Sequence, residues 1–207
     1  MTMMTNQQQT STRFIVSAFA IVLALGVILE AKIKIRAEPD PTFDFSPVST
    51  WAWDDEPGKV HMKRSAEDNE AAPLQARIQP TIMKYVADAM AERGMTLVAN
   101  GAPDVQLHYY VLVAVGVTGH EMGQFLQAVP YWGLPPFPPA TTSLNVVTNG
   151  SLVLDALLPG KAGERRVVWR GVAQSTIGDD DSPEKRDTRL RDASTGLVKR
   201  FPVKKKK

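Results

Sequence analysis

The chain has 207 residues, of which 43% are hydrophobic and none is cysteine. This hydrophobic content is enough for the core of one ordinary domain and argues against disorder throughout. Zero cysteines exclude disulfides, thiol nucleophiles, cysteine-ligated zinc and thioether-linked lipid anchors. The net charge of +2 is uneven: residues 38–203 hold 16 Lys+Arg against 21 Asp+Glu. This part is therefore near −5, which excludes the basic face that a nucleic-acid partner requires.

The first predicted element is an apolar segment, Phe14 to Leu29, which carries no charge over sixteen residues. As a helix it would be about 24 Å long, shorter than a hydrocarbon core of about 30 Å. Apolar regions of signal peptides run over roughly 7 to 15 residues. The segment thus falls between the two classes, and we assign residues 1–37 to a signal peptide or membrane anchor.

A polar linker, residues 38–41, leads into the stretch TFDFSPVSTWAWDDEP at residues 42–57. Phe43, Phe45, Trp51 and Trp53 share odd numbering, so in an extended chain they face one side. This spacing predicts a first strand whose aromatic face closes a core. The next residues, 54–73, are polar and rich in turn formers, and we interpret them as a loop.

A helix is predicted over residues 74–93, because Ile78, Ile82, Val86 and Met90 recur every four residues. Gly94 stands where a glycine commonly ends a helix. Pro80 lies inside this span, so it is expected to sit in the first turn or to mark the true start of the helix.

Three further strands are predicted after the helix. Residues 105–115, VQLHYYVLVAV, are rich in β-branched and aromatic residues. Asn149-Gly150 separates SLNVVT from SLVLDALL, the pattern of a hairpin turn, and residues 165–176 supply the next strand. We expect the hairpin and the following strand to form an antiparallel meander.

The long connection at residues 116–142 contains PYWGLPPFPP, with five prolines in residues 130–139. Connections of this length are usually functional or disordered. Its aromatic residues Tyr131, Trp132 and Phe137 form a candidate partner-binding loop. The alternative is a loop laid over the sheet.

A last helix is expected from Ser182 as N-cap and Pro183 as first helical residue to the stop at Pro202. Lys204 to Lys207 are interpreted as a solvated basic tail, with weak contact to anionic lipid as the alternative. The order of elements predicts one α+β domain, residues 38–203. We expect a mostly antiparallel sheet of about four to five strands, with two helices on one face and an apolar N-terminal helix before it.

Motifs for chemistry are incomplete. His120-Glu121 begins like the zinc-protease pattern, but position 124 is Gln instead of the second histidine ligand. Asp54, Asp55 and Glu56 are neighbours in a predicted turn, so they do not by themselves converge on a substrate. His108 is interpreted as a partly satisfied histidine of a strand. We therefore predict no catalytic residue, no metal site and no cofactor.

Six segments in the same order resemble the bacterial family known as domain of unknown function 4136. They include DFSPVSTWAWDDEP, ARIQPTIMKYVADAMAERGM, APDVQLHYYV, GSLVLDALL and VVWRGVAQ, followed by an apolar helix that ends in FP. The resemblance covers about residues 43–202 and implies an exported protein of the bacterial envelope. Members are often lipoproteins, but this sequence has no lipobox cysteine, so any attachment would come from residues 14–29.

We therefore expect a non-enzymatic protein of the cell envelope, periplasmic or anchored in the inner membrane by its N-terminal segment. Its partner would be an envelope protein or the cell wall. The alternative is a small-ligand or lipid-binding module of the periplasm, with a cleft lined by Met83, Met90 and the aromatic residues. Trp51, Trp53 and Trp169 are assigned to the structural core rather than to a site.

Overall fold

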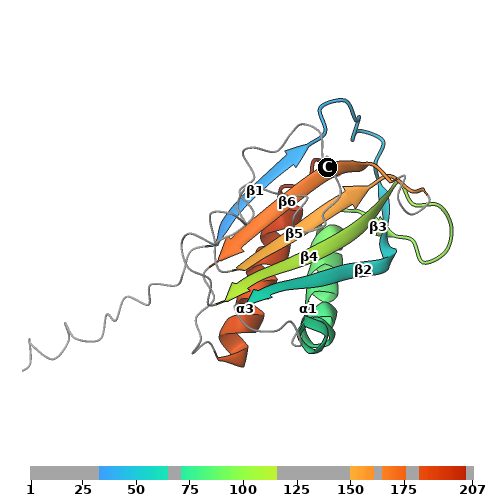
Figure 1. Ribbon diagram of the computed structural model, residues 1–207. Coiled ribbons are helices and arrows are strands. Elements are labelled where there is room, and N and C mark those ends of the chain that lie inside the picture. The colour runs from blue at the N-terminus through green and yellow to red at the C-terminus, as the bar shows by residue number, and fades with distance from the viewer. Residues whose placement is uncertain (1–32, 65–70, 116–149, 161–164, 176–181, 204–207) are drawn as a thin grey trace, which may run out of the picture. The chain divides into compact units, whose positions relative to one another are not determined.

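The computed structural model describes residues 33–64, 71–115, 150–160, 165–175 and 182–203. In these residues one mixed sheet of six strands is accompanied by two helices (Figure 1). The strands are β1 (Lys34–Pro39), β2 (Thr50–Arg64), β3 (Thr96–Leu97), β4 (Val105–Val115), β5 (Gly150–Leu157) and β6 (Val167–Ser175). The helices are α1 (Ala71–Glu92) and α3 (Pro183–Lys199).

The strands lie in the order β1-β6-β5-β4-β2-β3. Neighbours from β1 to β4 are antiparallel, whereas β2 runs parallel to both β4 and β3. The predicted α+β class and the two helices are confirmed, but the sheet is mixed and has six described strands. The parallel pairing follows from α1, because a helix between β2 and β4 returns the chain to the end at which β2 began.

Strand β1 was not predicted as a strand, since residues 34–37 were counted with the leader and residues 38–41 as a linker. The stretch instead pairs antiparallel with β6. Ile33, Ile35 and Ala37 alternate along it and pack against the core, while Lys34 and Arg36 are exposed. This period of two is the pattern of a half-buried strand.

The predicted loop over residues 54–73 is wrong for most of its length. Strand β2 continues to Arg64, and its register against β4 shifts between Trp53 and Gly58. Asp54 to Pro57 occupy this irregularity, so the acids and the proline that suggested a turn lie in a bulged part of a strand.

The predicted hairpin at Asn149-Gly150 is also wrong. Gly150 belongs to β5, and both edges of β5 are paired, one with β4 and the other with β6. Gly150 pairs with Val113 of β4 on one side and with Ser175 of β6 on the other. The antiparallel meander therefore consists of β4, β5 and β6. Residue 149 and the segment before it lie outside the described residues.

Local signals at the helix ends are confirmed. Gly94 has φ 77°, its N–H donates to Ala91 O (2.9 Å), and the N–H of Met95 donates to Met90 O (3.0 Å). These two bonds form a Schellman motif. Ser182 caps α3 with Pro183 directly after it. Pro80, however, lies in the interior of α1, so it marks neither the first turn nor the start of that helix.

Both helices cover the same face of the sheet, as seen in Figure 1, where the strands lie in front of them. Trp51 and Trp169 are buried in the resulting core, and Trp53 packs against its rim. The rings of Trp169 and Phe201 meet edge to face at 5.1 Å. Aromatic residues from β2, β6 and the end of α3 therefore join the two layers.

Replacing Trp169 tests how far this core depends on one ring. Trp169 is 0% exposed, so Trp169→Ala should lower the free energy of unfolding by about 3–5 kcal/mol, measured by urea denaturation. Trp53→Ala, at the rim, should cost less. The control is Leu97→Ala, because Leu97 is 52% exposed and its loss should change stability by no more than about 0.5 kcal/mol. Equal losses in Trp169→Ala and Leu97→Ala would contradict this packing.

Candidate functional site

Charged residues cross the helix-free face of the sheet in one row. Glu38 of β1 stands opposite Arg170 of β6, Arg170 opposite Asp155 of β5, and Asp155 opposite His108 of β4. Directly paired residues point to the same face. Leu107 lies in the core under the helices, so its neighbour His108 and the rest of this charged row point away from the helices.

The centre of the charged row is a buried ion pair. Asp155 and Arg170 are both 0% exposed. The guanidinium donates through Nε to Oδ1 at 2.7 Å and through Nη2 to Oδ2 at 2.6 Å. Burial lowers the pKa of Arg170, but the Asp155 carboxylate outweighs burial and raises it. In a bidentate pair of this kind each charge neutralises the other. Either charge alone would be too costly to bury among the apolar residues of these strands.

A second group of ionisable side chains, the Asp54 cluster, lies at the β2 end of the row and consists of Asp54, His108 and Arg165. His108 Nδ1 donates to Asp54 Oδ2 at 3.1 Å, and Arg165 Nη1 donates to Oδ1 of the same carboxylate. Burial raises the pKa of Asp54, but the hydrogen bonds from Arg165 and His108 together lower this pKa by more than burial raises it. The net shift of the pKa is therefore downward.

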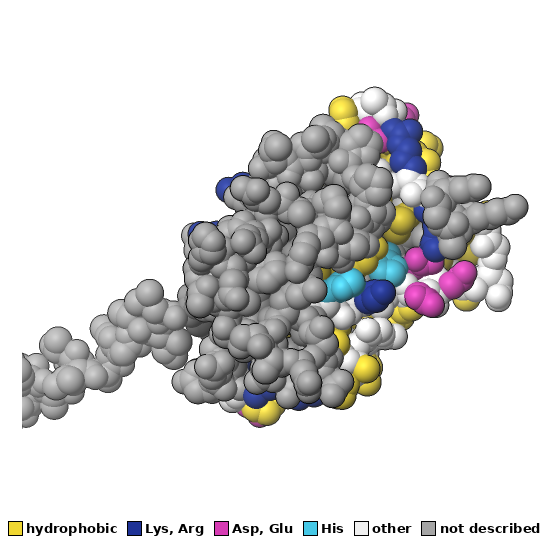
Figure 2. All heavy atoms as spheres, viewed as in Figure 1, with side chains coloured by type: hydrophobic (Ala, Val, Ile, Leu, Met, Phe, Trp, Pro, Cys, Tyr) yellow, Lys and Arg dark blue, Asp and Glu magenta, His cyan; other side chains and the backbone are white. Residues whose placement is uncertain are grey.

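Aromatic rings adjoin the Asp54 cluster. The Tyr110 ring lies 4.5 Å from the His108 ring and 6.2 Å from that of His61 on β2. Burial and the nearby Asp155 raise the pKa of Tyr110, which keeps its hydroxyl protonated. Figure 2, in the view of Figure 1, shows histidine, basic and acidic side chains side by side on this face.

The Asp54 carboxylate is suited to hold its two partners and to compensate charge rather than to accept a proton. A general acid or base works best with a pKa near the working pH. The lowered pKa of Asp54 makes its carboxylate a weak base. Among the described residues, no group of three or more His, Cys, Asp or Glu could hold a metal ion.

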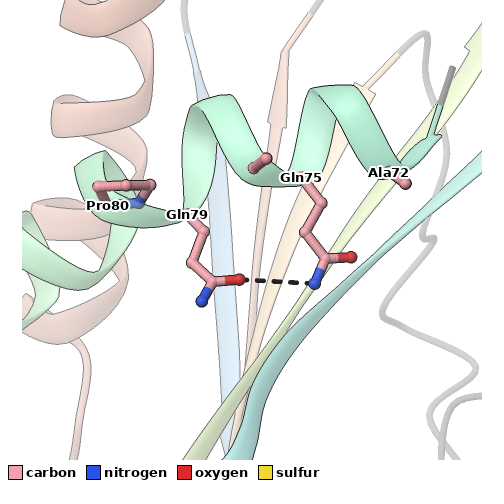
Figure 3. A pocket seen from close by; sticks show the side chains of 5 residues that line it. Ala72, Gln75, Gln79 and Pro80 are labelled. Atoms are coloured by element: carbon pink, nitrogen blue, oxygen red, sulfur yellow. Dashed lines mark hydrogen bonds between the residues drawn. The ribbon is translucent and has the colours of Figure 1, made fainter.

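An open groove lies on the other side of the molecule, along the first half of α1. It has a volume of about 400 Å³ and is lined by Ala72, Gln75, Ala76, Gln79 and Pro80. These residues recur at helical spacing, so they share one flank of α1. Figure 3 shows Gln75 and Gln79 extending from this flank toward β2. Gln75 Nε2 donates to Gln79 Oε1 at 3.5 Å.

The Gln75 amide binds the backbone of β2. Its Nε2 donates to Gly58 O at 2.9 Å, and its Oε1 accepts from Val60 N at 3.3 Å. Backbone groups of a strand point to its two edges, and β4 occupies the inner edge of β2. Gln75 therefore binds the outer edge, where β3 pairs only with Thr50 and Trp51.

Gly58 is required where the outer edge and the groove meet. A Cβ at this position would lie 2.1 Å from the ring of Tyr109. The Tyr109 hydroxyl in turn donates to Gln79 Oε1 at 3.2 Å, and burial raises the pKa of Tyr109 to about 12. One glycine thus lets a ring of β4 pass close to the β2 backbone and reach the groove.

The residues predicted from sequence are only partly placed by this geometry. Tyr131, Trp132, Phe137 and the segment from Phe14 to Leu29 lie outside the described residues. No helix of the described part has the length and apolarity needed to cross a membrane. Met90 is buried in the core and does not line the groove, which the sequence analysis did not predict.

The ion pairs of the charged row and of the Asp54 cluster were not predicted from the sequence. A signal was present in two of the strands. Asp155 stands alone among apolar neighbours in SLVLDALL, and Arg170 does so in VVWRGVA. Single opposite charges in two buried strands indicate a pair, because a lone buried charge is too costly. Asp54 gave no such signal, since it adjoins two further acids.

A comparison with models of protein families shows which family the chain belongs to. Residues 35–203 match the model of DUF4136, a domain of unknown function. The chain belongs to the DUF4136 family. This confirms the resemblance that was inferred from six short segments. A search of curated proteins found no match to this DUF4136 chain.

Several solved structures are similar to the DUF4136 chain, among them the following three. A DUF4136 family protein of Bacteroides thetaiotaomicron has 16% identity and a TM-score of 0.47, covering 82% of this chain and 94% of that one. A PDZ domain protein of Parabacteroides distasonis has 13% identity and a TM-score of 0.42, covering 92% of this chain and 40% of that one. PelC of Paraburkholderia phytofirmans, a dodecamer, has 10% identity and a TM-score of 0.34, covering 80% and 92%.

Breaking the buried pair should be more harmful than replacing it. Arg170→Met leaves the Asp155 carboxylate buried without its bidentate partner, so we expect a loss of about 3–5 kcal/mol in the free energy of unfolding. Asp155→Leu combined with Arg170→Met removes both charges and should recover most of that loss. Urea unfolding of the two variants checks this, and a double variant less stable than Arg170→Met would contradict it.

The lowered pKa of Asp54 predicts a loss of stability in acid. The pKa of an aspartate in the unfolded chain is about 3.9, and the pKa of Asp54 in the folded protein lies below this value. Its contribution is fully present above the unfolded pKa and is lost as the pH falls through the folded pKa. Asp104, whose pKa is lowered by the N–H groups of Ser49 and Thr50, acts in the same sense.

Asp54→Asn should therefore flatten the dependence of unfolding free energy on pH below about pH 4, measured by urea unfolding from pH 7 to pH 2.5. The control is Asp192→Asn on the exposed side of α3, which should keep the wild-type dependence. A wild-type slope in Asp54→Asn would show that the cluster does not hold this carboxylate ionised.

Proposed function

We propose that this chain is an exported protein of the bacterial cell envelope that acts by binding an envelope protein or the cell wall. The observation that carries the binding role is the open groove of about 400 Å³ along α1, beside a sheet edge that β3 covers over only two residues. Open sheet edges and concave surfaces are the features by which proteins hold extended partners.

The charges of the helix-free face support a binding role over catalysis. Asp54 is bound by Arg165 and His108, and Asp155 is bound by Arg170. These carboxylates already have their counter-ions, so they have little capacity left for a reacting group. The charged row therefore serves the rigidity of the sheet, and the groove on the other side offers the free surface.

Export is supported by the sequence. The apolar segment at residues 14–29 precedes the domain, and the chain has no cysteine, which is compatible with an oxidising compartment. Cleavage of this segment as a signal peptide would give a released protein, whereas its retention as an anchor would give a membrane-bound one.

Expression of the full chain in a Gram-negative host tests both parts. We expect the domain to be released into the periplasm, or to be digestible by external protease in spheroplasts. A photo-crosslinking residue at exposed Ala76, Thr96 or Lys185, on α1, β3 and α3, should give adducts to protein or peptidoglycan in intact cells. A domain protected until lysis would contradict the location. The absence of adducts at all three positions would contradict the binding role.

A further inference from the structure

We propose that the outer edge of β2, from Gly58 to Arg64, is a strand-addition site for an extended peptide segment of a partner protein. Gln75 occupies this edge until the peptide displaces it. The inference rests on the proposed function and names the chemistry of the partner at the groove. It assigns recognition to the peptide backbone, whose donors and acceptors complete the edge of a sheet.

The bonds of Gln75 already show which ligand fits. One side-chain amide donates to Gly58 O and accepts from Val60 N. A residue of a neighbouring strand would make the same two bonds with its own backbone N–H and C=O groups. The edge is therefore built for a peptide.

The edge continues beyond the part that Gln75 holds. Strand β2 extends to Arg64 and pairs with β4 as far as Val115, so its backbone is held in strand geometry up to its end. Among the described strands, only β3 pairs with the outer edge, at Thr50 and Trp51. An added peptide would thus find about seven residues of ordered backbone, from Gly58 to Arg64.

The groove supplies room beside the edge. Its walls on α1 include Ala72 and Ala76, which are small and exposed, next to Gln75. Successive side chains of a strand point to opposite faces. One set of peptide side chains would therefore enter the groove along α1, and the other would point to the helix-free side. Small alanines leave the volume that larger residues would fill.

Gln75 can leave the edge without losing every partner. Its Nε2 already donates to Gln79 Oε1 at 3.5 Å, and a small rotation toward Gln79 would shorten this hydrogen bond. The two bonds to β2 are then replaced by two bonds from the peptide. Because the exchange preserves the number of hydrogen bonds at the edge, peptide binding competes with Gln75 at a modest free-energy cost.

The probe is a fluorescein-labelled peptide of alternating threonine and valine, eight residues long, with lysine at each end. Its binding to the full chain in mild detergent is measured by fluorescence anisotropy. Gln75→Met keeps the length of the side chain but removes the competing amide. We expect this variant to bind the peptide roughly fivefold more tightly than the wild type, since one net hydrogen bond is worth about that factor.

Arg77→Met is the matched control, because Arg77 is an exposed residue of α1 that does not line the groove. It should bind the peptide as the wild type does. A peptide methylated on alternate backbone nitrogens lacks the donors for strand pairing and should not bind. Hydrogen–deuterium exchange should slow in residues 58–64 when the unmethylated peptide is present.

Three results would overturn the inference: no binding to Gln75→Met at millimolar peptide, equal binding of the methylated peptide, or weaker binding to Gln75→Met than to the wild type. Dimerisation of Gln75→Met without peptide, seen by light scattering, would assign the edge to a second copy of the chain instead. If the peptide fails while crosslinks in intact cells persist at Thr96 or Lys185, the binding function stands and only its assignment to this edge falls.

Discussion

The in-register pairing of Asp155 with Arg170 is the constraint on which the sheet depends. Both side chains are fully buried, and they are direct partners on β5 and β6. A slip of one residue would turn one charge to the helix-covered face, where Trp169 and Ala156 now lie in the core. The resulting unpaired charge would cost several kcal/mol. The ion pair therefore fixes which face of the sheet receives the helices.

A second constraint acts where β2 passes Tyr109. The register shift between Trp53 and Gly58 places Asp54 against His108 and Arg165 on the helix-free face. After the shift, Gly58 meets the Tyr109 ring at a distance that excludes any side chain. The same irregularity therefore affects two surfaces of the molecule. Asp54, at its start, lies at the end of the charged row on the helix-free face, and Gly58, directly after it, is the first residue of the outer edge that Gln75 binds.

Sequence patterns predicted the parts that depend on local physics. The Ser182-Pro183 start of α3, Gly94 after α1 and the β-branched strand at Val105–Val115 each act over a few residues. Long-range pairing was not predictable in this way. Asp54 meets Arg165 across 111 positions of sequence, and the polar residues 54–57 looked like a turn because no local rule reveals a bulge inside a strand.

The sheet edge at β2 shows how one residue serves both protection and recognition. Proteins commonly block an exposed edge with charge, proline or a bulge, and these devices are permanent. Here the bulge covers residues 54–57, but Gly58 and Val60 beyond it are held by the Gln75 amide. A side chain on a neighbouring helix can rotate away, whereas a bulge cannot. Gln75 thus protects the edge against non-specific strand pairing. A peptide can still bind if it makes the same two hydrogen bonds together with further ones along β2.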